Sequence, residues 1–102
     1  LQINKGISRN MTKNKRFILD SIKMDLHRVI TASGDLTKKL PTKSIIAFLE
    51  HADKDFTKAL LDSREKSIRK DLKILAGELE TLSDPHKRLR WTEDVMTARC
   101  RL

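Results

Sequence analysis

Apolar residues recur along most of the chain at spacings of three and four, which is the period of an α-helix. Five of them share one face between residues 68 and 82: Ile68, Leu72, Leu75, Leu79 and Leu82. Four basic residues of the same stretch share another face: Lys66, Arg69, Lys70 and Lys73. At ~100° per residue the apolar set spans about 80°, and the basic set centres roughly 150° away. The pattern predicts an amphipathic helix with a cationic outer face.

A first helix is predicted over residues 12–32, where the apolar residues from Ile18 to Ile30 fall on one side. Gly34 follows this pattern, and we expect it to close the helix in the left-handed conformation that glycine adopts easily. A loop then leads to Pro41, whose fixed φ suits the first turn of a helix. The second helix is therefore expected to begin at Thr42.

The second helix is the most hydrophobic of the chain. Its apolar face consists of Ile45, Phe48, Leu49, Ala52, Phe56, Ala59 and Leu60. The polar run 62–67 puts this face out of phase with the one that begins at Ile68. Two outcomes fit this change of phase: separate helices, or one helix of about forty residues that changes its packing partner midway. We favour the interruption.

Two further signals complete the helical pattern. Gly77 costs about 1 kcal/mol relative to alanine inside the third helix, and we expect it to allow a close helix crossing. Asp84 and Pro85 are a typical N-cap and first-turn pair, so a fourth helix is expected to begin near Pro85. Its apolar positions are Trp91, Val95, Ala98 and Leu102. Short connections between these elements predict an all-α antiparallel bundle of about four helices.

Composition agrees with one helical domain, because three glycines, two prolines and no tyrosine leave few turn signals for a β-sheet. The sequence shows no membrane span and no signal peptide, so we expect a soluble, intracellular and most simply cytoplasmic protein. Residues 1–11 are expected to be a flexible basic arm, or a remnant of cloning, ahead of one bundle domain over 12–102. Since the apolar spacing still continues at Leu102, we expect this domain to be a fragment of a longer chain.

Residues that carry out catalysis or hold cofactors form no recognisable motif. The histidines His27, His51 and His86 stand in different predicted helices, and the one cysteine, Cys100, cannot complete a zinc site. The glycines stand apart, so no phosphate-binding loop is present. His51 belongs to a small polar cluster that we interpret as a solvated patch. We therefore expect no catalytic residue, metal, cofactor or small-molecule ligand, and predict that the protein is not an enzyme.

The formal net charge of +8 is the strongest indication of a partner. Seven basic residues are predicted to form an interaction surface: Lys66, Arg69, Lys70, Lys73, Lys87, Arg88 and Arg90. Trp91 lies among arginines and is a candidate anchor for a partner, although packing against Val95 and Ala98 inside the bundle fits it better. The basic faces either neutralise the phosphates of a nucleic acid or are the solvated faces of a bundle that binds protein.

These features favour a non-enzymatic protein-interaction module with an adaptor, regulatory or assembly role. It is expected to act through the basic helix faces or through an open apolar seam, and to bind another protein or a second copy of itself in a dimer. The alternative is a small basic regulator that associates with nucleic acid without strong sequence preference. One tryptophan and three phenylalanines offer few platforms for stacking bases, which favours the protein partner.

Two short segments resemble known families. Residues 79–91, LETLSDPHKRLRW, resemble the end of a J-domain, where a helix runs into a Ser-Asp-Pro turn followed by basic residues and an aromatic one. The His-Pro-Asp motif of J-domains is absent, because the nearest candidate, His51-Ala52-Asp53, lacks the proline. Residues 26–30, followed by Phe48 and Ala52-Asp53, resemble the Hha family of small helical regulators over a few positions. That likeness implies a non-catalytic protein that docks on a DNA-binding partner.

Overall fold

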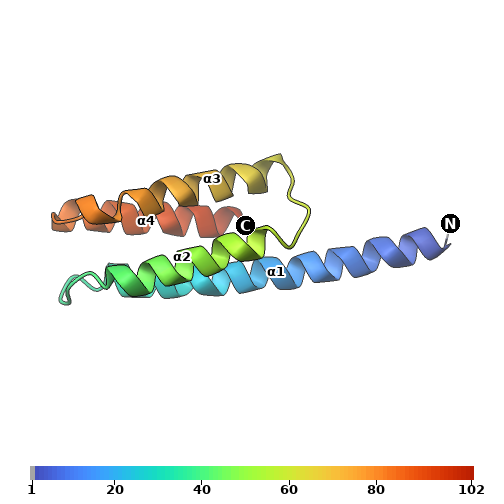
Figure 1. Cartoon of the computed structure of the whole chain (residues 1–102), viewed down its shortest axis with the longest axis horizontal. Coiled ribbons are helices and arrows are strands. Elements are labelled where there is room, and N and C mark those ends of the chain that lie inside the picture. The colour runs from blue at the N-terminus through green and yellow to red at the C-terminus, as the bar shows by residue number, and fades with distance from the viewer. Residues whose placement is uncertain (1) are drawn as a thin grey trace.

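A computed structural model describes the backbone of residues 2–102 and the side chains of residues 14–102. Four helices form the molecule, α1 (Gln2–Gly34), α2 (Thr42–Phe56), α3 (Ser63–Gly77) and α4 (Pro85–Arg101), with one short 3-10 turn, η1 (Leu79–Thr81). The chain runs up and down, so that consecutive helices are antiparallel (Figure 1). No strand occurs in the described residues, and the predicted all-α bundle of four helices is confirmed.

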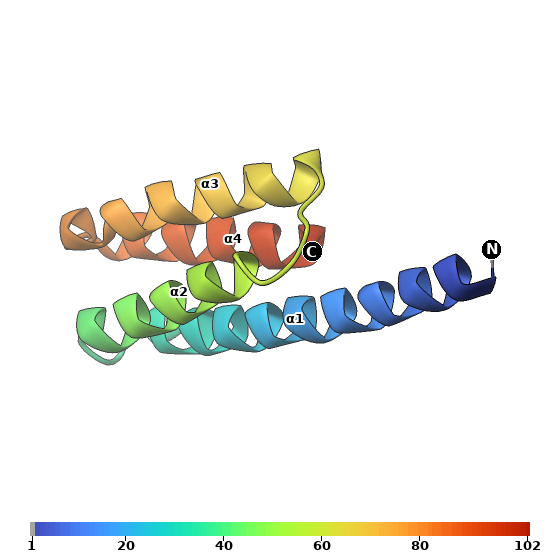
Figure 2. The ribbon, with the colours of Figure 1, turned by 45° about the vertical axis from the view of Figure 1, so that its right-hand side comes forward.

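α1 is the longest helix, and its first half extends beyond the other three helices (Figure 2). It begins at Gln2 rather than near residue 12, because no proline and only Gly6 interrupt the preceding residues. The backbone of residues 2–11 therefore continues the helix. The side chains of this segment lie outside the described residues, so the basic arm stays a prediction.

The core lies where the apolar faces of the four helices meet. Every helix contributes buried apolar side chains to it: Ile22, Leu26, Val29, Ile45, Leu49, Ala52, Phe56, Ile68, Leu72, Leu75, Leu79, Trp91, Val95 and Ala98. Burial of one such large side chain stabilises a fold by about 1.5–3 kcal/mol. Most of each predicted apolar face is thus buried. Leu60 is an exception at 76% exposed, because α2 ends at Phe56, before the predicted face does.

α2 and α3 are separate helices, which is the outcome that we favoured over one long helix. A capping box at the start of α3 explains the break. The Asp62 carboxylate accepts a hydrogen bond from the main-chain N–H of Glu65 at 2.8 Å, and the Glu65 carboxylate accepts one from the N–H of Asp62 at 2.9 Å. These two bonds satisfy donors that a new helix leaves free. Buried Glu65 also pairs with Lys15 of α1 at 2.7 Å, which ties α3 to α1.

Neither glycine signal behaves as predicted. Gly34 ends α1, but no glycine in the described part of the chain has a positive φ, so the left-handed closure is wrong. Gly77 ends α3 in open space, where an added Cβ would meet nothing within 4 Å, so the close crossing is wrong as well. In contrast, α4 begins as predicted: the Asp84 carboxylate accepts from the N–H of His86 at 3.0 Å, with Pro85 in the first turn.

The helices do not all pack equally. α1 packs closely against α2 and α4, whereas α3 packs less closely on its neighbours α4 and α2. Of these neighbouring pairs, α2 and α3 have the loosest contact. In the described part of the chain, no helix combines the length and the apolar character that crossing a membrane requires. The candidate site lies between α2 and α3.

Candidate binding groove between α2 and α3

Arg88 is not on the surface, because only 8% of the residue is exposed. Its guanidinium group reaches the C-terminal end of α1 and donates to the main-chain oxygens of Ser33, Asp35 and Lys38, each at 2.7 Å. A longer bond of 3.5 Å goes to the oxygen of Ala32. The last carbonyl groups of a helix have no hydrogen-bond partners within the helix. Arg88 donates hydrogen bonds to carbonyl groups at the end of α1. Its assignment to the interaction surface is therefore wrong, and it caps α1 in place of a left-handed Gly34.

Trp91 is also buried, with 2% of the residue exposed. It lies in the core with Val95 and Ala98, as the alternative prediction has it. Its indole N–H donates to the main-chain oxygen of Leu75 at 2.8 Å, which joins α4 to α3. The candidate role of Trp91 as an anchor for a partner is wrong, because the side chain is already used inside the bundle.

The remaining predicted basic residues form two separate groups. The group on α3 has three exposed lysines and a half-buried arginine: Lys66, Lys70, Lys73 and Arg69. The group near the start of α4 has two exposed residues: Lys87 and Arg90. Lys66 and Lys87 both lie near the start of their helices, and since these helices are antiparallel, the two groups lie toward opposite ends of the bundle (Figure 1). The structure therefore does not unite the predicted surface.

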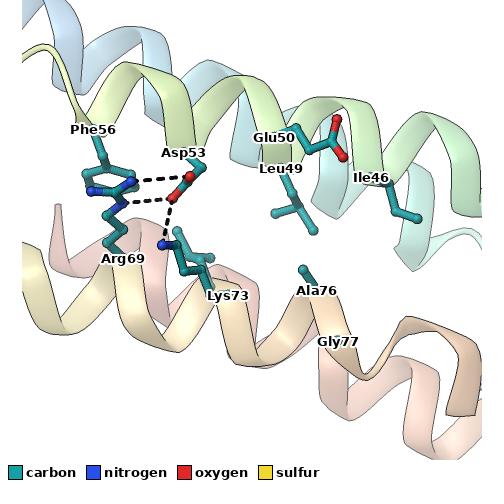
Figure 3. Close-up of a pocket in the computed structure, with 10 residues that line it drawn as sticks. Ile46, Leu49, Glu50, Asp53, Phe56, Arg69, Lys73, Ala76 and Gly77 are labelled. Atoms are coloured by element: carbon teal, nitrogen blue, oxygen red, sulfur yellow. Dashed lines mark hydrogen bonds and ion pairs between the residues drawn. The ribbon is translucent and has the colours of Figure 1, made fainter.

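A groove opens between α2 and α3, and we call it the α2–α3 groove (Figure 3). It has a volume of about 360 Å³. Residues of both helices line it: Ile46, Leu49, Glu50, Asp53, Phe56, Arg69, Leu72, Lys73, Ala76 and Gly77. Leu49 and Leu72 are each 6% exposed and form a closed apolar floor, whereas Ile46 is 37% exposed and accessible on one wall. The groove is thus an apolar hollow with charged residues at its rim.

Charged side chains bridge the groove at one end (Figure 3). Arg69 donates through Nε to Oδ1 of Asp53 at 2.7 Å and through Nη2 to Oδ2 at 3.3 Å. Lys73 lies 3.9 Å from the same carboxylate. The hydrogen bond from Arg69 lowers the pKa of Asp53, although burial opposes this, and the same bond raises the pKa of Arg69. The bridge holds α2 and α3 at a fixed separation here, while the groove stays open toward Ile46 and Gly77.

A second hollow continues the groove past this bridge, and we call it the basic end. It shares Phe56, Arg69 and Lys73 with the groove and has a volume of about 650 Å³. Its charged lining consists of four cationic side chains and includes no carboxylate: Lys66, Arg69, Lys70 and Lys73. Leu60, which is 76% exposed, adds an apolar side chain to the lining. The α3 group of predicted basic residues therefore adjoins a groove, and the α4 group lies elsewhere.

The apolar part of the groove was not predicted from the sequence. Ile46, next to Ile45, could have indicated it, because it widens the apolar face of α2 beyond what one packing partner covers. Asp53 gave no such signal, because its pairing with Arg69 depends on how α2 and α3 are placed. The groove itself depends on the separation of two helices, which hydrophobic periodicity does not specify.

The Asp53–Arg69 pair should make stability depend on pH in the acid range. Because the pKa of Asp53 is lowered from 3.8, the pair stabilises the fold above that value and loses its effect as pH falls through the folded-state pKa. Asp53 is 37% exposed and solvent screens the pair, so Asp53→Asn should cost only about 0.5 kcal/mol near neutral pH. Urea unfolding at neutral and acid pH measures this cost. If the difference in free energy of unfolding between the unchanged protein and Asp53→Asn persists at acid pH, the stabilising role of the Asp53–Arg69 pair is wrong.

The fold and the site define an all-α bundle with an open apolar groove and a basic end. Comparison of the chain with protein-family models, with curated proteins and with solved structures finds no match. The short likenesses to J-domains and to the Hha family therefore carry no function to this chain. What the protein does has to be inferred from the groove itself.

Proposed function

We propose that the protein is a non-enzymatic interaction module that binds an amphipathic helix of a partner protein in the α2–α3 groove. The observation that supports this proposal most directly is that the apolar groove continues into the basic end. The partner helix would place apolar residues on Leu49 and Leu72 and acidic residues beside Lys66, Lys70 and Lys73. The role is that of an adaptor, a regulator or an assembly factor.

The apolar floor supplies affinity in this proposal. A helix that lies in a groove binds through apolar anchors spaced three, four and seven residues apart, which follow one side of the helix. Ile46 and Ala76 stand on facing walls of the α2–α3 groove and would contact such anchors (Figure 3). A volume of about 360 Å³ is in the range of pockets that enclose ligand groups in proteins.

The basic end supplies direction and partner choice. Asp53 already neutralises part of the charge of Arg69. Lys66 and Lys70 are exposed, and no carboxylate lines the basic end beside them. Complementary charge across an interface speeds association and disfavours partners of the wrong sign. A partner helix with acidic residues at one end of its apolar anchors is therefore favoured over a basic helix.

A nucleic acid is the second candidate, because three exposed lysines on one face of α3 can neutralise phosphates. Binding of single strands also uses exposed aromatic side chains beside the basic groove. Phe56 and Trp91 are buried here, Phe48 is half-buried, and exposed Phe17 lies on α1, away from the basic end. The apolar character of the α2–α3 groove therefore favours a protein partner over a nucleic acid.

The test uses two designed helical peptides with the same leucine anchors, one followed by glutamates and the other by lysines. Fluorescence anisotropy should show that the glutamate peptide binds at least ten times more tightly than the lysine peptide, a difference of about 1.4 kcal/mol. Ile46→Asp should weaken binding of the glutamate peptide by about tenfold. The triple reversal Lys66→Glu, Lys70→Glu and Lys73→Glu should remove the preference for glutamate.

Lys87→Glu and Arg90→Glu together are the matched control, since they reverse charge in the other basic group and should leave peptide binding unchanged. Equal binding of both peptides, or none, would contradict the proposal. A DNA duplex that binds in a strongly salt-dependent way, and is lost only in the triple reversal, would favour the nucleic-acid function instead. Concentration-dependent dimers blocked by Ile46→Asp would assign the groove to a second copy of the chain.

A further inference from the structure

Asp25, His51 and Asp55 converge on the side of the bundle where α1 faces α2. His51 Nδ1 lies 2.5 Å from Oδ2 of Asp25 and 3.7 Å from Oδ2 of Asp55. His51 and Asp55 are one turn apart on α2, and Asp25 comes from α1. One ligand-type atom from each residue lies within 4.8 Å of the others. None of the three lines the α2–α3 groove, so this cluster is independent of the proposed function.

The two carboxylates of this cluster are buried, and the imidazole is not. The side chains of Asp25 and Asp55 are 4% and 6% exposed, whereas that of His51 is 58% exposed. Two carboxylates at low exposure repel each other unless positive charge lies between them. In the structure Arg28 and Lys58 pair with the two carboxylates, and the His51 imidazole lies between them, where its hydrogen bond with Asp25 raises its pKa. The cluster is thus a charge-compensated pair of buried carboxylates with an opening toward solvent at the imidazole.

The second oxygen of each carboxylate is held by an outer side chain. Oδ1 of Asp25 accepts from Arg28 at 3.1 Å, and Oδ1 of Asp55 accepts from Lys58 at 3.1 Å. The hydroxyl of Ser21 donates to Oδ2 of Asp55 at 2.8 Å. Outer hydrogen bonds of this kind orient the ligands of metal sites and leave the inner atoms for the ion. Here the Oδ2 atoms of both carboxylates face Nδ1 of His51, and Oδ2 of Asp55 keeps its second lone pair for an ion beside the bond from Ser21.

We propose that Asp25, His51 and Asp55 form a binding site for Zn²⁺, in which the ion lies between the two Oδ2 atoms and Nδ1 of His51. Zinc takes imidazole and carboxylate ligands at about 2.0–2.2 Å in a tetrahedral arrangement, which separates ligand atoms by about 3.3 Å. The separations of 2.5 and 3.7 Å from Nδ1 lie on either side of that value. A small rotation of the exposed imidazole makes room for the ion, and water completes the fourth position.

The choice of ion follows from the ligand set. Calcium and magnesium take oxygen ligands almost exclusively, whereas imidazole suits zinc and its neighbours in the first transition row. A Zn²⁺ ion would accept the Nδ1 lone pair of His51 and place positive charge between the carboxylates. It would also link α1 to α2, so binding should stabilise the folded state over the unfolded one.

The test starts from the chain with Cys100→Ser, because an exposed cysteine also binds zinc. After treatment with a chelator, thermal unfolding is followed with and without Zn²⁺, and stoichiometry and affinity are measured by calorimetry. We expect one Zn²⁺ per chain and a Tm that rises by several degrees in a ~100-fold excess over Kd. Co²⁺ in place of Zn²⁺ should give the intense visible absorption of a tetrahedral site.

His51→Gln should lower Zn²⁺ affinity at least tenfold and remove the Co²⁺ absorption. His27→Gln and His86→Gln are matched controls, since both histidines are exposed and lie outside the cluster, and they should bind as the parent does. Circular dichroism establishes that each variant is folded before titration, and the shape-conserving Asp55→Asn should repeat the loss. Absence of binding, or His51→Gln that binds as tightly as the parent, would overturn the proposal.

Discussion

Replacing Arg88 by alanine should lower the free energy of unfolding by about 3–5 kcal/mol. The reason is that its guanidinium group donates to three carbonyl oxygens at 2.7 Å around the end of α1. Removal of the donors takes the guanidinium partner from all three carbonyl groups, of which that of Ser33 is buried, and it also leaves a cavity between α4 and α1. Natural domains are stable by about 5–15 kcal/mol, so this single change should remove a large share of the total. Urea unfolding followed by circular dichroism measures the loss.

Arg90→Ala is the matched control, because Arg90 is exposed two residues further along the same helix. Its effect should stay within about 0.5 kcal/mol. Arg88→Lys should recover little, since one ammonium group cannot reach carbonyls that are spread around a planar guanidinium. If Arg88→Ala and Arg90→Ala have the same small effect, Arg88 is a surface residue in solution and the capping role is wrong.

Trp91→Ala should cost about 3–5 kcal/mol, the usual cost of truncating a large buried aromatic residue. Trp91 is 2% exposed and packs with Val95 and Ala98 in the core. Trp91→Phe keeps a six-membered aromatic ring in the core but removes the indole bond to the oxygen of Leu75, which keeps only the N–H of Glu78. That variant should cost about 1–2 kcal/mol.

The one tryptophan of the chain also reports its own environment. A buried indole should be protected from a soluble quencher such as acrylamide in the native protein and become accessible on unfolding. Thermal or urea unfolding provides the free energies for Trp91→Ala and Trp91→Phe. Fluorescence that is fully quenched in the native state, together with a small effect of Trp91→Ala, would place the residue on the surface and restore it as an anchor for a partner.

The helices and most of the core could be predicted from the sequence because both depend on local spacing. Ile68, Leu72 and Leu75 repeat with the helical period, and their burial follows from it. The break before α3 had a local signal as well, since Asp62 and Glu65 have the spacing of a capping box. That signal settles the choice between two helices and one, which the change of apolar phase alone left open.

The errors concern residues whose roles depend on distant parts of the chain. Arg88 contacts carbonyl groups that are fifty or more residues away, so nothing in its neighbourhood distinguishes it from exposed Arg90. The pairing of Asp25 with His51 crosses from α1 to α2 in the same way. For the proposed zinc site, two of the three residues had a local signal in the sequence, because His51 and Asp55 are four residues apart on one helix. The third ligand required the fold.

We propose the α2–α3 groove as the surface through which this protein binds a partner. The most direct measurement is a titration of the isotopically labelled chain with the leucine–glutamate peptide, followed by two-dimensional NMR of the backbone amides. The proposal predicts that resonances of residues along the groove, such as Ile46, Arg69 and Ala76, shift first and most strongly. Shifts centred on Lys87 and Arg90, or none at concentrations where DNA binds, would contradict it.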